Sequence, residues 1–205
     1  MSKVDLSKEL KDCYKAKKKP DIVYVPDGKF LSILGKGDPG GEEYQLAVQA
    51  LYGFGYALKF HYKAEEKDFK VMPLEGLWWI ENGTFDMNNP APREDWRWRA
   101  MIRVPGFVTE EVMEEMLPAL KEKKGGNVDK VTLWGYHEGV SAQVMYVGPY
   151  SDEAPTINML HEWVEKQGYR LRGDHHEIYL SDPRRTAPEK LKTILRHPLD
   201  ELGLG

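Results

Sequence analysis

The chain has 205 residues, of which 41% are hydrophobic and 30% charged, and its formal net charge is −4 at pH 7. A mildly acidic chain lacks the basic surface that non-specific nucleic-acid binding needs, so we expect no nucleic-acid partner. The single cysteine, Cys13, excludes an intramolecular disulfide. Because no stretch has the length of a membrane helix and the first 19 residues lack a secretory signal, we predict a soluble, cytoplasmic protein without membrane contact.

Helical and strand-like spacings of apolar residues both occur along the chain and predict an α+β fold. Helices are predicted over residues 42–60, 109–124, 154–167 and 188–195. Strands are predicted over residues 22–25, 30–34, 69–72, 77–80, 96–104, 128–136 and 141–147, with a hairpin that pairs 169–171 with 177–180. In the strand at 96–104, alternation predicts a basic outer face with Arg97, Arg99 and Arg103.

The order strand, glycine loop, helix, strand, strand occurs twice, at about residues 29–80 and 141–180. Two such units predict one domain over residues 20–196, between an N-terminal arm (1–19) and a C-terminal tail (197–205). We expect an antiparallel sheet with a pseudo-twofold ligand groove and with its helices on the opposite face. Aligning the two copies turns the rings of Trp78 and Tyr179 toward this groove.

A short run that begins at His175 has strand chemistry and carries the main site candidate. Ile178 would point to one face of the sheet, and Glu177 and Tyr179 to the other. A carboxylate among aromatic rings suits a flat or cationic ligand, and loss of hydration raises the pKa of such a group toward that of a general base. The residues alone also fit an exposed acid on a half-solvated sheet.

No metal or nucleophile site is predicted. His175 and His176 are consecutive in a strand and therefore point apart. Cys13 lies in an arm that we expect to be mobile, and the chain has no Gly-x-Ser-x-Gly run. We assign the other histidines to packing or to the surface: His61, His137, His161 and His197.

Several segments, in order along the chain, resemble the gyrase-inhibitor-like family of small-molecule-binding domains. They are Val25-Pro26-Asp27-Gly28, Gly35-Lys36-Gly37-Asp38-Pro39, Pro73-Leu74-Glu75-Gly76-Leu77-Trp78-Trp79, Val147-Gly148-Pro149-Tyr150, Gly168-Tyr169-Arg170-Leu171 and the run from His175 to Arg196. The resemblance as a whole covers roughly residues 20–196. Because the order of the segments matches, the resemblance is more specific than any one segment.

The resemblance implies paired strand-helix-strand-strand units around a groove that binds bulky, flat, often cationic molecules, without a cofactor. A subset of the family hydrolyses cyclopropane-bearing DNA-alkylating antibiotics by adding water, and its functional glutamate matches Glu177. We therefore expect Glu177 and Tyr179 to be catalytic. The expected ligand-binding residues are Trp78, Trp134, Tyr136, Tyr146, Glu177 and Tyr179. The sequence lacks a helix-turn-helix module, so we expect a stand-alone monomer or homodimer rather than a transcription regulator.

Three functions stay open on the sequence. The first is a detoxifying hydrolase in which Glu177 is the general base. The second is a non-catalytic multidrug binder or sensor in which Glu177 is only a counter-charge. The third is a protein-interaction module, as direct gyrase inhibition in part of the family would suggest.

Overall fold

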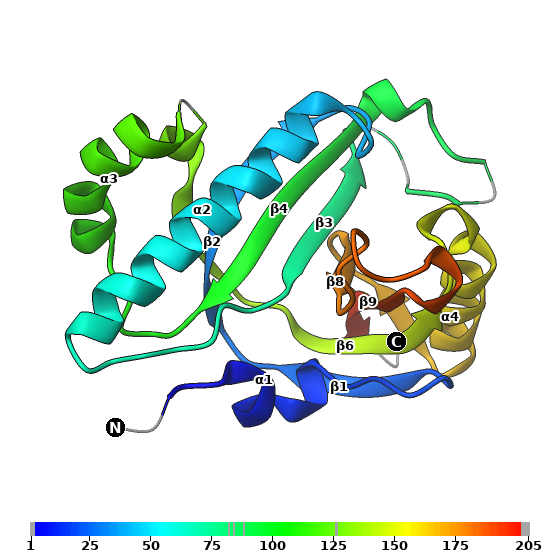
Figure 1. The fold of residues 1–205 in the computed structure, drawn as a ribbon. Helices are drawn as coiled ribbons and strands as arrows, with labels where there is room; N and C mark the ends of the chain where they lie inside the picture. The colour runs from blue at the N-terminus through cyan, green and yellow to red at the C-terminus, as the bar shows by residue number, and fades with distance from the viewer. Residues whose placement is uncertain (1–2, 82, 84, 88, 126, 202–205) are drawn as a thin grey trace.

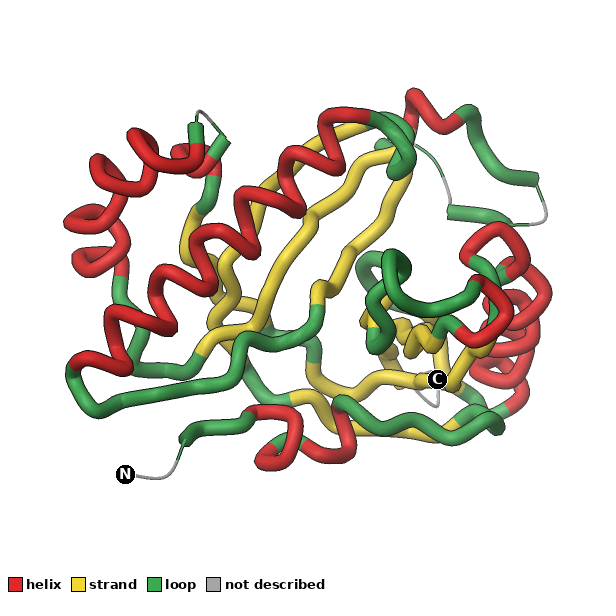
Figure 2. Tube along the Cα trace, viewed as in Figure 1, coloured by secondary structure: helices red, strands yellow, loops and turns green. Residues whose placement is uncertain are grey.

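A computed structural model describes residues 3–81, 83, 85–87, 89–125 and 127–201 of the chain. Residues 1–2 of the predicted arm and residues 202–205 of the predicted tail lie outside these ranges. The fold is α+β with an antiparallel sheet, as predicted (Figures 1 and 2). Within the described residues, no helix is long and apolar enough to cross a membrane.

The sheet joins two three-stranded groups at its centre. Its strands are β1 (Asp21–Val25), β2 (Gly28–Lys36), β3 (Leu74–Ile80), β4 (Trp96–Val104), β5 (Thr132–Tyr136), β6 (Gly139–Val147), β7 (Tyr169–Leu171), β8 (His175–Tyr179) and β9 (Lys192–Glu201). They run in the order β1-β6-β9-β8-β3-β4-β2-β5, with β7 paired to β9. The two groups, β2-β4-β3 and β6-β9-β8, meet where β3 pairs with β8, so that Gly76 lies opposite Glu177.

The helices are α1 (Leu6–Glu9), α2 (Glu42–Ala64), α3 (Glu110–Lys124) and α4 (Ala154–Lys166). The long helix α2 lies across β2 and β4, and α4 covers the other group of strands (Figure 1). The apolar stripe of α4, from Ile157 to Val164, packs on Val144 and Leu195. Leu195 pairs with Glu177 and therefore points to the same face of the sheet.

Helices α2 and α4 thus lie on the face of the sheet to which Trp78, Glu177 and Tyr179 point. We had expected the helices on the face opposite the groove. The alternation of the central strands explains the difference: Trp78 pairs with Trp98, and Tyr44 of α2 contacts both rings. The side chain of Glu177 consequently lies on the face of the sheet that α2 and α4 cover.

The prediction of a helix over residues 188–195 is wrong. After a single 3₁₀ turn at Pro188–Lys190, β9 begins at Lys192 and runs between β6 and β8, across the boundary that we predicted at residue 196. The predicted hairpin is also wrong, because β7 pairs with β9 while β8 pairs with β3 and β9. Short apolar runs fit both the helical and the strand spacing of apolar residues, and pairing with strands distant in sequence decides between helix and strand. Residues 70–72 likewise form no strand, and Phe69 makes only an isolated bridge to Val4.

The N-terminal arm packs against part of the face of the sheet opposite the helices. Cys13 is buried, and the backbone carbonyl of Asp12 accepts a hydrogen bond of 2.8 Å from Gln143. The expectation of a mobile arm is therefore wrong for this part of the chain. The basic outer face predicted for β4 is also wrong at Arg103, which is buried and donates to the carbonyls of Pro26 and Asp27.

Candidate functional site

A chain of hydrogen bonds links three predicted site residues on the helix-bearing face. The indole Nε1 of Trp78 donates to the hydroxyl of Tyr179 at 3.2 Å, and this hydroxyl donates to Oε2 of Glu177 at 2.7 Å. The Glu177 side chain is 12% exposed. The alternative that Glu177 is a solvated surface acid is therefore wrong, and its carboxylate is held in a fixed orientation.

Gly76 makes room for this chain of bonds. A Cβ at this position would lie 2.9 Å from Nε1 of Trp78 and 3.2 Å from the hydroxyl of Tyr179. Both distances are shorter than ordinary contacts, so a larger residue would displace the two rings. A glycine opposite Glu177 thus lets an indole and a phenol meet over the centre of the sheet.

Two further tyrosines enclose the same position. The ring of Tyr44, on α2, lies 5.4 Å from that of Trp78. The ring of Tyr150, just before α4, meets Tyr179 edge-on at 5.5 Å. Burial raises the pKa of Tyr44 well above its ordinary value, and burial together with the charge of Glu153 raises that of Tyr150 to about 12. These hydroxyls therefore stay protonated and can donate hydrogen bonds at neutral pH.

A second buried carboxyl, Glu153, lies beside Glu177. Glu153 precedes the first residue of α4 and is 3% exposed. Burial, together with the charge of Glu177, raises the pKa of Glu153 to about 9. The carboxyl of Glu153 therefore keeps its proton at neutral pH. Among the described residues, neither carboxyl forms an ion pair with a lysine or arginine.

A cavity of about 530 Å³ opens next to this cluster, between the end of β3 and α4. Its wall includes Trp78, Phe85 and the three histidines His161, His175 and His197. The ring of His175 stacks on that of Phe85 at 5.2 Å. Burial lowers the pKa of His161 to about 4, so this imidazole is neutral at pH 7. Sequence analysis had assigned His161 and His197 to packing or to the surface.

The other predicted aromatic residues are not all brought to this position. Tyr146 shares the face of Glu177 and lies near Glu153, but its hydroxyl donates to the backbone carbonyl of Pro149 at 2.9 Å rather than to a carboxyl group. Trp134 and Tyr136 stack on each other at 4.8 Å and pack with Phe30, on the opposite face of the sheet. The structure therefore separates Trp134 and Tyr136 from Glu177.

On that opposite face, a buried ionic network links β8 to the neighbouring segments of the sheet. His176 lies 2.7 Å from Glu138 and 3.0 Å from Glu75, and Arg196 lies 3.1 Å from Glu138. Burial alone would raise the pKa of Glu138, but the charges of His176 and Arg196 outweigh it and lower this pKa to about 2. His175 and His176 point apart, as predicted, and only His175 faces the helices.

Sequence reasoning missed Tyr44, Glu153 and the two additional histidines. Tyr150 stands in one of the segments that carried the family resemblance, and Glu153 follows it by three residues. That neighbourhood is the one sequence signal that could have indicated Glu153. Tyr44 belongs to the apolar stripe of α2, where nothing distinguishes it from a core residue.

Comparisons with known proteins agree with this architecture. An uncharacterised conserved protein from Listeria innocua is 45% identical, with a TM-score of 0.89, and the match covers 97% of this chain and 100% of that one. Two structures of hydrolases from Listeria innocua are each 42% identical, with TM-scores of 0.85 and 0.87 and the same coverage. No curated protein gives a match. The GyrI-like small molecule binding domain matches residues 18–200, and the chain therefore belongs to the GyrI-like family.

Proposed function

We propose that this protein binds bulky aromatic molecules, cations in particular, between α2 and α4, and that it hydrolyses cyclopropane-bearing alkylating compounds there. The observation that carries the proposal is the buried pair Glu153 and Glu177, set among aromatic rings. A negative charge in such a position attracts a cationic or electron-poor aromatic ligand. Cys13 fits a reducing compartment, and we place the activity in the cytoplasm.

The two structures described as hydrolases support a hydrolytic reaction in this family, since each is 42% identical over 97% of the chain. The arrangement of the two carboxyls supports water addition. Tyr179 and His175 each approach one oxygen of Glu177, at 2.7 and 3.3 Å, and each oxygen keeps a lone pair for a water molecule. Glu177 is then oriented as a base beside the protonated carboxyl of Glu153.

The reaction follows from these roles. Glu177 takes a proton from water while the water oxygen bonds to the least hindered carbon of a cyclopropane conjugated to a dienone. The ring carbon–carbon bond breaks, and its electron pair moves into the dienone to give a phenolate. A tyrosine hydroxyl donates a hydrogen bond to this oxygen, and Glu153 donates a proton to it. The proton that Glu177 took from water then passes to Glu153, which restores both carboxyls. The product is the substrate plus one water.

The test is incubation with a spirocyclopropyl dienone, followed by mass spectrometry of the small molecule. We expect a mass gain of one water over many turnovers, and a loss of rate of at least about 100-fold in Glu177→Gln, which keeps the shape of the side chain but cannot take the proton. The control is Glu114→Gln, which changes an exposed carboxylate on α3 and should leave the rate unchanged.

Unchanged compound would overturn the catalytic role. If a bulky aromatic cation such as tetraphenylphosphonium then still quenches tryptophan fluorescence, the protein is a non-catalytic binder. In that case Glu177→Gln should weaken binding of the cation by about tenfold or more and spare a neutral aromatic ligand.

A further inference from the structure

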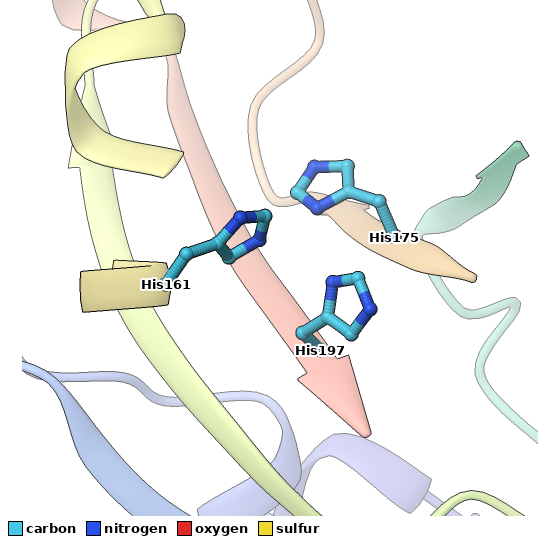
Figure 3. Close-up of side chains that lie close together, drawn as sticks. All are labelled: His161, His175 and His197. Atoms are coloured by element: carbon cyan, nitrogen blue, oxygen red, sulfur yellow. The ribbon is translucent and has the colours of Figure 1, made fainter. Parts of the chain in front are cut away.

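Three histidines from separate elements of the C-terminal half of the chain converge beside the cavity. His161 comes from α4, His175 from β8 and His197 from β9. One nitrogen from each ring lies within 4.8 Å of the others. Figure 3 shows the three rings turned toward a common point.

The nitrogens at this point have no hydrogen-bond partner. Within the described part of the chain, Nε2 of His161, Nδ1 of His175 and Nδ1 of His197 are buried and unsatisfied. A buried polar atom without a partner is destabilising, and native proteins rarely gather three of them. A single cation that accepts the three lone pairs would satisfy them together.

Two of the rings have a possible acceptor on the side away from this point. Nε2 of His175 lies 3.3 Å from Oε1 of Glu177, although the two atoms form no hydrogen bond in this geometry. The backbone of Gly173 lies beside His197. A ligating histidine typically donates its second nitrogen to a carboxylate or a carbonyl, and this contact fixes its tautomer. Glu177 and Gly173 are placed to do so here.

We propose that His161, His175 and His197 bind a divalent transition-metal ion, with Zn²⁺ as the best fit. Imidazole is a preferred ligand of zinc, and three protein ligands with one open position are the pattern of catalytic zinc sites. Zn–N distances of about 2.0–2.1 Å require the nitrogens to draw closer by about 1–1.5 Å. The half-buried side chain of His161 can rotate to supply this movement.

The open coordination position would face the cavity of about 530 Å³, large enough for a small organic ligand. The proposal does not depend on cyclopropane hydrolysis, because its measurement is metal binding itself. A failure of one proposal leaves the other testable.

The test is calorimetric titration of untagged, EDTA-treated protein with Zn²⁺, with Co²⁺ absorption spectra as a second readout. We expect one equivalent to bind, a tetrahedral-type Co²⁺ spectrum, and at least 100-fold weaker binding in His161→Ala and His197→Ala. His137→Ala is the matched control, since the His137 side chain is 63% exposed and lies outside the cluster. Glu177→Gln should weaken binding by about 10–100-fold through the ring of His175.

Equal zinc affinity in the wild type and His161→Ala would overturn the proposal, as would saturation with no Co²⁺ band. Circular dichroism of each variant separates loss of the site from loss of the fold. If His197→Ala does not fold, His161→Gln on the helix surface decides the question, because it removes one ligand at a position that is not fully buried.

Discussion

Replacing Tyr179 with phenylalanine tests the hydrogen bonds that hold the candidate groove together. The hydroxyl accepts from Nε1 of Trp78 at 3.2 Å and donates to Glu177 at 2.7 Å. Its removal leaves a buried indole N–H unsatisfied, at about 1–3 kcal/mol, and removes a hydrogen bond to a charged group, worth about 1.5–3 kcal/mol. Because neighbouring groups relax, we expect the free energy of unfolding to fall by about 2–4 kcal/mol.

Urea unfolding followed by circular dichroism measures this change, provided that the slope m is the same for both proteins. Tyr56→Phe is the control: Tyr56 is 49% exposed, and its replacement should change stability by less than about 0.5 kcal/mol. In a double-mutant cycle, Tyr179→Phe and Glu177→Gln should show a coupling of about 0.5–3 kcal/mol. A loss below about 0.5 kcal/mol for Tyr179→Phe, at unchanged m, would refute the assignment of this hydroxyl as the link between the indole and the carboxylate.

Three other predictions test the surroundings of the groove. Gly76→Ala should lower the free energy of unfolding by about 1–3 kcal/mol in urea, because its Cβ would meet the Trp78 indole at 2.9 Å. Glu138→Gln should cost about 3–5 kcal/mol at pH 7, because Arg196 loses its buried partner. The pKa of Glu138 is lowered from 4.5 to about 2, so the stabilisation that its charge gives the folded protein is complete above pH 4.5 and is lost as the pH falls through 2. If the difference in free energy of unfolding between the wild type and Glu138→Gln did not shrink in acid, this assignment would be contradicted. Trp134→Ala should leave the affinity for an aromatic cation unchanged, because its ring lies on the other face of the sheet; a tenfold loss measured by fluorescence would place the ligand there instead.

The local pattern of apolar and capping residues was sufficient to predict much of the architecture. Periodicity and capping residues predicted α2, α3 and α4, and the side chain of Thr109 caps α3 as expected. The repeated order of elements predicted an antiparallel α+β fold, and the motif order predicted the family, both of which are confirmed. Such features depend on residues close together in sequence, where spacing alone selects helix or strand.

Strand pairing and the choice of sheet face depended on contacts between distant residues. Trp78 and Tyr179 are 101 positions apart, and their hydrogen bond exists only because β3 pairs with β8. The apolar spacing at the start of β9 fits a helix equally well, and only its pairing with β6 and β8 makes this segment a strand. Local spacing carries no information about such partners.

The sequence by itself determined that Glu177 and Tyr179 lie on one face of a strand, since side chains alternate along it. Only the tertiary structure decided which helices cover that face and which groups meet there. It brought Glu153 beside Glu177 and gathered His161 and His197 around His175. The physical reason is that burial and charge coupling arise from packing between elements, and these set the proton on Glu153 and leave the histidine nitrogens without partners.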